Sequence, residues 1–199
     1  MHAQAMDRWV RHCGLYFRQD PETECMILHP ENSRKLHIDM LLFKPSDLYP
    51  FYKLCTMGAS DYKLPLTFCS RNEFVMFLSP EENLKENLSW FSDVLLSVAL
   101  YPAENHMALS WGHSILWGRQ PETDMGGAYL DLPYPIEGPG FFSCSLGPFQ
   151  KSQCLQVTLL TEEEIQKLIR MGPRKFCEFL YPTEGAPHFF SQRYRSQIF

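Results

Sequence analysis

The chain has 199 residues, of which 45% are hydrophobic, 14% aromatic and 21% charged. This is the composition of one sizeable globular domain, and it excludes a disordered or low-complexity protein. The formal net charge of −5 at pH 7 argues against nucleic-acid and membrane partners and favours a basic partner.

The cysteines are scattered without a C-x-x-C pair, and their odd number, seven, argues against a disulfide framework or a zinc knuckle. Charged residues near the N-terminus interrupt any signal-peptide core. The longest nearly apolar stretch, Val94 to Tyr101, is too short to span a bilayer. We therefore expect a cytoplasmic protein with reduced thiols.

The first predicted element is an amphipathic helix over residues 3–13. Apolar residues recur at helical spacing from Met6 to Cys13, and Gly14 is a natural helix stop.

Strands are expected next. Apolar runs at residues 24–29 and 35–43 are separated by turn formers and predict a hairpin. The second run is apolar on both faces, which is typical of a central strand. Further strands are predicted at residues 51–57 and 73–78, with turn chemistry at Gly58-Ala59-Ser60-Asp61.

Two capping boxes predict helices. Ser79-Pro80-Glu81-Glu82 would begin the longest helix, which should stop before Tyr101-Pro102. Thr161-Glu162-Glu163-Glu164 would begin a second helix that Gly172 ends, and Pro173 would start a third.

Between these helices, short apolar runs punctuated by Gly and Pro predict strands joined by loops. The runs cover residues 107–117, 128–132, 141–146 and 154–160. Residues 182–199 contain aromatic side chains without a clear period, so this tail either straps across the body or stays loose.

Catalytic signatures are missing from the sequence. The histidines form no H-E-x-x-H or H-x-x-x-H motif, so a catalytic metal is not predicted. No G-x-S-x-G elbow is found, and the glycine pairs lack nucleotide-binding spacing. We therefore expect no cofactor.

Two weaker possibilities for chemistry remain. His37 and Asp39 project from one strand face and could share a site with His113, as a proton-transfer pair or a small-ligand site. A structural hydrogen bond is the favoured interpretation. Cys55 or Cys69 could pair with His113 as a nucleophile, but buried structural thiols are favoured.

Several segments, in order, resemble the Suppressor of fused domain family over roughly residues 35–181. The sharpest is Tyr52 to Asp61, which ends in a G-x-S-D turn. The others are His37-Ile38-Asp39, Glu73 to Pro80, Leu95 to Tyr101 with Trp111-Gly112-His113, Leu155 to Glu164, and Phe176 to Leu180.

The resemblance implies an α+β fold with a mixed, mostly antiparallel sheet flanked by helices, similar to the N-terminal lobe of the family. A single domain over residues 1–181 is expected, with residues 182–199 as a tail that is packed on it or flexible. It also implies a non-enzymatic protein-binding module, which agrees with the missing catalytic motifs.

The resemblance also suggests a partner. The animal protein has a second lobe and grips a Gli peptide between its lobes, so Gli binding is not carried over to a chain that ends after the first lobe. Short members are mostly bacterial, and some are proposed immunity proteins. A stand-alone bacterial immunity protein that neutralises a toxin domain is therefore the specific hypothesis.

Candidate interface residues lie in or beside the family-like segments. Acidic side chains could attract a basic toxin, although solubility and helix capping are their simpler roles. They are Glu22, Glu24, Glu81, Glu82 and Glu162 to Glu164. The proposed partner-binding residues are Tyr52, Asp61, Tyr62 and Trp111, with core packing the favoured role of Trp111.

Overall fold

The computed structural model describes residues 3–30, 36–63, 71–184 and 187–195. The strands are β1 (Cys25–Leu28), β2 (Asp39–Phe43), β3 (Tyr52–Met57), β4 (Asn72–Leu78), β5 (Ser114–Leu116), β6 (Gly127–Asp131), β7 (Ser143–Gly147) and β8 (Gln150–Leu160). The helices are α1 (Ala3–Phe17), α2 (Pro21–Glu24), α3 (Leu84–Asn105), α4 (Glu162–Met171) and α5 (Pro173–Leu180), with 3₁₀ turns η1 (Ala59–Asp61) and η2 (Pro139–Phe142).

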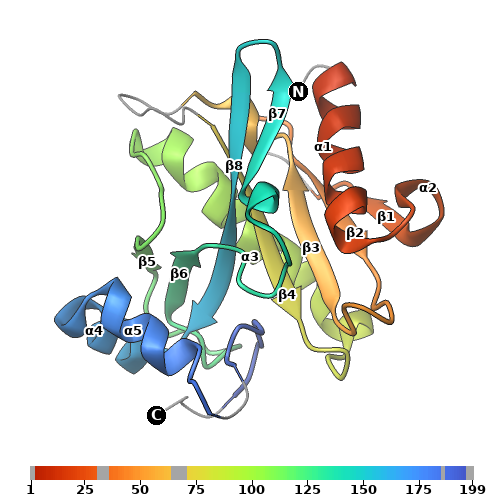
Figure 1. Ribbon diagram of the computed structural model, residues 1–199. Helices are drawn as coiled ribbons and strands as arrows, with labels where there is room; N and C mark the ends of the chain where they lie inside the picture. Colours follow the sequence, from red (N-terminus) through yellow and green to blue (C-terminus); the bar gives the residue numbers. More distant parts are fainter. Residues whose placement is uncertain (1–2, 31–35, 64–70, 185–186, 196–199) are drawn as a thin grey trace.

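Within the described residues, the strands form one sheet in the order β1-β2-β3-β4-β8-β6-β5, and β7 also pairs with β8. The β4–β8 pair is parallel and the other strand pairs are antiparallel. The predicted α+β fold with a mixed, mostly antiparallel sheet is therefore confirmed (Figure 1). In the described part of the chain, no helix is both long and apolar enough to cross a bilayer.

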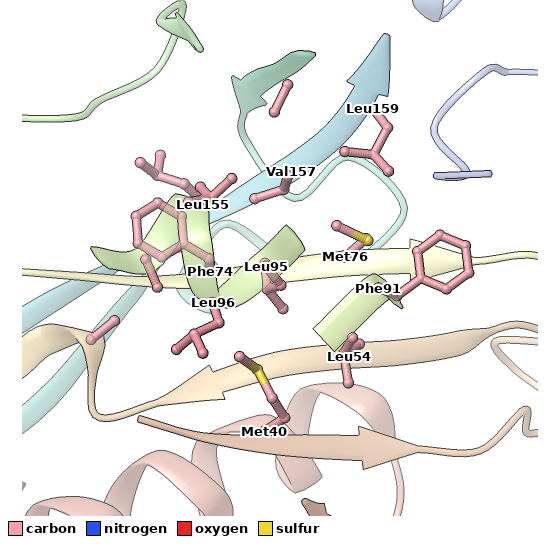
Figure 2. Close-up of a cluster of buried hydrophobic side chains, with 14 of the residues drawn as sticks. Met40, Leu54, Phe74, Met76, Phe91, Leu95, Leu96, Leu155, Val157 and Leu159 are labelled. Atoms are coloured by element: carbon pink, nitrogen blue, oxygen red, sulfur yellow. The ribbon is translucent and has the colours of Figure 1, made fainter. Parts of the chain in front are cut away.

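The sheet is buried on both faces because apolar side chains alternate along its strands. Met40 and Leu42 of β2 belong to the core beneath α3, whereas Leu41 and Phe43 belong to the core beneath α1. Figure 2 shows the α3 side of the sheet. There, side chains of α3 meet strand side chains: Phe91, Leu95 and Leu96 lie against Met40, Leu54, Phe74, Met76, Leu155, Val157 and Leu159.

Several predicted elements are confirmed. β1 and β2 pair antiparallel, with Cys25 opposite Phe43 and Leu28 opposite Met40. Thr161 and Glu164 form the expected reciprocal capping box at the start of α4. Gly172 ends α4 and Pro173 begins α5, as their backbone preferences predict.

The predicted start and end of the longest helix are both wrong. The Ser79 hydroxyl accepts a hydrogen bond from the amide of Glu81 in a tight turn, and α3 begins only at Leu84. At the other end α3 continues through Pro102 to Asn105, where left-handed His106 closes it. Apolar packing evidently outweighs the hydrogen bond that Pro102 cannot donate, since Pro102 and Ala103 are buried.

Two predicted strands are shorter than expected. Of residues 107–117, only Ser114–Leu116 are strand, and residues 107–113 form turns and loop. The run over residues 141–146 begins inside η2, so β7 starts at Ser143.

Beyond Pro182, residues 187–195 contact the sheet and α4. The Ser191 hydroxyl donates to the Val157 carbonyl at 3.0 Å and accepts from the Leu159 amide at 3.2 Å. The Arg195 guanidinium lies 2.7 Å from the Glu164 carboxylate, and these side chains are 11% and 1% exposed. The buried ion pair therefore links this segment to the capping box of α4.

Lys53 of β3 is fully buried among the aromatic rings of Phe17, Tyr49 and Phe51. Its ammonium group donates to Gln19 Oε1 and the Lys44 carbonyl, both at 2.8 Å, and to the Tyr49 carbonyl at 3.4 Å. Three neutral acceptors therefore match its three donors. Burial still penalises the charge and lowers the pKa of Lys53 from 10.5 to about 8.

The lowered pKa predicts a specific pH dependence. Between about pH 8 and 10.5 the unfolded chain holds the Lys53 proton more tightly than the folded chain, so this group makes stability rise with pH in that window. NMR titration of the Lys53 ¹³Cε resonance should give a midpoint near 8. Exposed Lys85 provides the reference signal, and a Lys53 midpoint near the ordinary 10.5 would contradict the assignment.

Gly14 does not end α1, which continues to Phe17. A β-carbon at Gly14 would lie 2.5 Å from Cγ of Pro21 and 2.8 Å from the carbonyl oxygen of Gln19. The glycine is therefore required by the close approach of the chain that enters α2.

The sign of the stability change caused by Gly14→Ala tests this explanation. An alanine inside an unobstructed helix would stabilise the protein by about 1 kcal/mol relative to glycine. Here the clash with Pro21 should make the variant less stable than the parent, as measured by chemical denaturation. Ser89→Ala at an exposed position of α3 is the control and should change stability by less than about 0.5 kcal/mol.

Candidate functional site

The Gly58–Asp61 turn is built on a buried carboxylate. Oε1 of Glu73 accepts hydrogen bonds from the Gly58 and Ser60 amides, both at 3.0 Å, and Oε2 accepts from the Thr56 hydroxyl at 2.6 Å. Glu73 is fully buried, and burial raises the pKa of its carboxyl group against the opposing effect of these hydrogen bonds. The turn is thus fixed from inside the sheet.

The backbone of this turn requires glycine at its first position. Gly58 has a φ of 121°, and a β-carbon there would lie 2.3 Å from the His37 carbonyl oxygen. On the outer side, the Arg71 guanidinium donates to the Ser60 and Asp61 carbonyls. These contacts hold the exposed Asp61 at a defined place on the surface.

A second buried carboxylate organises a group of aromatic side chains. Oδ1 of Asp131, at the end of β6, accepts from the Trp111 indole and the Leu132 amide, both at 2.8 Å. Oδ2 accepts from the Tyr181 hydroxyl at 2.9 Å. The Tyr181 ring stacks on Tyr134 with centroids 3.8 Å apart.

Three aromatic side chains connected through Asp131, namely Trp111, Tyr134 and Tyr181, form what we call the Trp111 surface. Trp111 and Tyr134 are 38% and 52% exposed, whereas Asp131 is 4% exposed. Burial and the Asp131 charge raise the pKa of the Tyr181 hydroxyl, which therefore keeps its proton as a donor at neutral pH. The expectation that Trp111 packs in the core is wrong, because its indole is exposed and held by one hydrogen bond.

The structure does not bring the four predicted interface residues onto one surface. Tyr52 starts β3 and packs against the core beneath α3, at the opposite end of β3 from Asp61 and half-buried Tyr62. Two hydrogen bonds connect the surroundings of Asp61 and Trp111. Arg71 donates to the Asp61 carbonyl, and the adjacent Asn72 donates through Nδ2 to the carbonyl of Leu109, two residues before Trp111, at 2.7 Å. Tyr134 and Tyr181 were missed because hydrogen bonds to Asp131 and ring stacking connect them to Trp111, and spacing along the sequence does not reveal such contacts.

The predicted grouping of His37, Asp39 and His113 is not assembled. Four strands separate β2 from β5, the strand that His113 precedes. Instead, Oδ1 of Asp39 lies 2.8 Å from Nδ1 of His29 and 3.1 Å from Nε2 of His37. Among the described residues, this trio is the one group of three or more His, Cys, Asp or Glu side chains with converging ligand atoms.

For Cys55, the favoured interpretation as a buried structural thiol is confirmed. Cys55 is a free, buried cysteine on the α1 side of the sheet, and Cys69 lies outside the described residues. Burial raises the pKa of neighbouring Cys13 and Cys154 well above the ordinary value, which keeps those thiols protonated.

Residues 34–193 match the family model described as Suppressor of fused protein (SUFU). The chain belongs to the Suppressor of fused family. The match extends past residue 181 into the segment that we expected to be a tail. A search of curated proteins finds no match to this chain.

Solved structures of Suppressor of fused proteins share the fold. The Sufu protein in a crystal structure of the Sufu–Fu complex gives a TM-score of 0.71 at 14% identity, over 98% of this chain and 92% of that one. A putative SUFU homologue from Neisseria gonorrhoeae gives 0.67 at 12% identity, over 98% and 97% of the two chains. Drosophila Suppressor of Fused gives 0.69 at 16% identity, and this match covers 98% of this chain but 51% of that protein.

Removing the Glu73 carboxylate should disrupt the Gly58–Asp61 turn. Glu73→Ala leaves two buried amides and one hydroxyl without their acceptor, which should cost at least about 3 kcal/mol of unfolding free energy at about 1–3 kcal/mol per group. Glu73→Gln keeps one carbonyl oxygen for the two amides and should cost clearly less. Denaturation curves measure both variants.

Glu178→Ala, at an exposed position of α5, is the matched control and should stay within about 0.5 kcal/mol of the parent. Equal stability of Glu73→Ala and the parent would show that the turn does not depend on this carboxylate.

Proposed function

We propose that this Suppressor of fused domain is a non-enzymatic protein-binding module and that the Trp111 surface is its principal contact with a partner. The observation that carries this proposal is the group of exposed aromatic side chains fixed by the buried Asp131 carboxylate. Family membership supports it, since a related Sufu protein has been solved in complex with Fu.

The physical case rests on preorganisation. The Trp111 indole N–H is already paired with Asp131, so a partner that covers the ring need not supply an acceptor for it. Tyr134 is stacked on Tyr181, whose hydroxyl is also paired with Asp131. Fixed aromatic side chains lose little conformational entropy on binding, and such residues are frequent interface anchors.

For the partner, we propose a basic toxin domain that this chain neutralises, as an immunity protein would. The net charge of −5 supports electrostatic attraction to a basic protein. Not every acidic residue is available for this role. Glu164 is committed to the capping box and to Arg195, Glu82 accepts a hydrogen bond from Asn87, and Glu163 pairs with Arg119, whereas the Glu81 side chain is exposed.

The test is capture of the tagged protein's partner from its native host, identification by mass spectrometry, and calorimetry with the purified partner. Trp111→Ala and Tyr134→Ala should each weaken binding by at least about 2 kcal/mol, the usual threshold for an interface anchor. Phe149→Ala removes a fully exposed aromatic ring from the turn between β7 and β8 and is the matched control.

The outcomes are distinct. Loss of affinity in the Trp111 and Tyr134 variants, but not in the Phe149 variant, supports the proposed surface. Unchanged affinity in both variants refutes that surface, and a partner that is not a toxin refutes the immunity role while leaving protein binding intact.

A further inference from the structure

Three potential metal ligands converge at the end of the β1–β2 pair. His29 Nδ1 and His37 Nε2 lie 2.8 Å and 3.1 Å from the same oxygen, Oδ1 of Asp39. One ligand atom from each of the three residues lies within 4.8 Å of the other two. None of the three belongs to the Trp111 surface.

Strand register explains why they meet. Leu28 is opposite Met40 in the antiparallel pair, so the next residues outward, His29 and Asp39, are also cross-strand neighbours. His37 precedes Asp39 by two residues, which places both side chains on the same side of an extended chain. The convergence thus follows from an H-x-D segment and a histidine that directly follows the neighbouring strand.

The chemistry of the three groups matches that of a zinc site. Zinc is bound by imidazole nitrogen and carboxylate oxygen at about 2.0–2.2 Å, and two histidines with one carboxylate leave the fourth tetrahedral position for water or another ligand. Ligand atoms around such an ion lie about 3.3 Å apart, which follows from those bond lengths. The two measured separations, 2.8 Å and 3.1 Å, are close to that edge length.

The three side chains differ in solvent exposure, and this difference suits an ion that exchanges with solvent. The Asp39 side chain is 4% exposed, so its oxygen is held in place by the surrounding sheet. Both histidine side chains are 68% exposed, so an ion can reach them from solvent with little rearrangement. A plain hydrogen-bonded trio would have the same contacts but would not respond to zinc.

We propose that His29, His37 and Asp39 bind a divalent transition-metal ion, with Zn²⁺ as the fitting ion. The ion ties the end of β1 to the start of β2, and β1 is an edge strand of the sheet. Because the folded chain assembles the ligands, zinc binding stabilises the folded state by mass action.

The test starts from protein treated with a chelator and returned to chelator-free buffer. Calorimetric titration with zinc chloride should show one saturable site, and Co²⁺ should give the visible absorption of a tetrahedral site. Zinc should also raise the Tm. His29→Ala and His37→Ala should each weaken zinc binding by more than about 100-fold, since even outer-sphere partners of a metal contribute about 10–100-fold.

His113→Ala is the matched control, because this exposed histidine lies before the opposite edge strand β5, and the variant should bind zinc like the parent. Circular dichroism without metal should show that all variants remain folded, as expected for exposed positions. If the parent shows no saturable zinc site, or if both histidine variants bind zinc as the parent does, the proposal is refuted. The second result would mean that zinc binds to other residues.

Discussion

The order of strands in the sheet depends on β8, whose two edges pair with different strands. One edge pairs with β4 in parallel through Gln153–Gln156. The other edge pairs first with β7, at Gln150–Gln153, and then with β6, at Gln156–Leu160. β6 and β7 are both antiparallel to β8, so residues 132–142 are an excursion between two strands that follow the same edge (Figure 1). This exchange of partners decides where the surface groups lie.

Polar side chains collect where β6 ends. Asp131 is paired with Gln156, the last position before the β6 pairing stops. The Gln156 side chain accepts from the Tyr134 amide at 2.9 Å and donates to the Thr158 hydroxyl at 3.0 Å, while Asp131 accepts from Trp111 and Tyr181. Buried polar groups need partners, and here Trp111, Tyr134 and Tyr181 supply three of them. The Trp111 surface therefore lies at the point where β6 separates from β8.

Sequence patterns predicted the elements better than they predicted the site. The capping box at Thr161 formed because its glutamate reaches back to the Thr161 amide, whereas Ser79 caps a tight turn and Glu82 bonds to Asn87 instead. The prediction that Gly14 ends the first helix was wrong, because this glycine is required by the close approach of Pro21, which lies on the next element of the chain. The same limit applied to Trp111, whose exposure depends on Asp131 twenty residues away on another element. Spacing along one segment carries no information about such partners, although it did place His37 and Asp39 on one face.

The role of each buried carboxylate depends on the groups that contact it. Glu73 meets two amides and a hydroxyl, and Asp131 meets an indole, an amide and a hydroxyl. Amides and indoles donate hydrogen bonds but do not bind metal ions at neutral pH, so these two carboxylates fix a turn and a surface. Asp39 differs because the groups facing it are imidazole nitrogens, each of which can donate a proton or coordinate a metal with the same geometry. Of these three buried carboxylates, Asp39 is therefore the one whose hydrogen-bonding partners are themselves potential metal ligands.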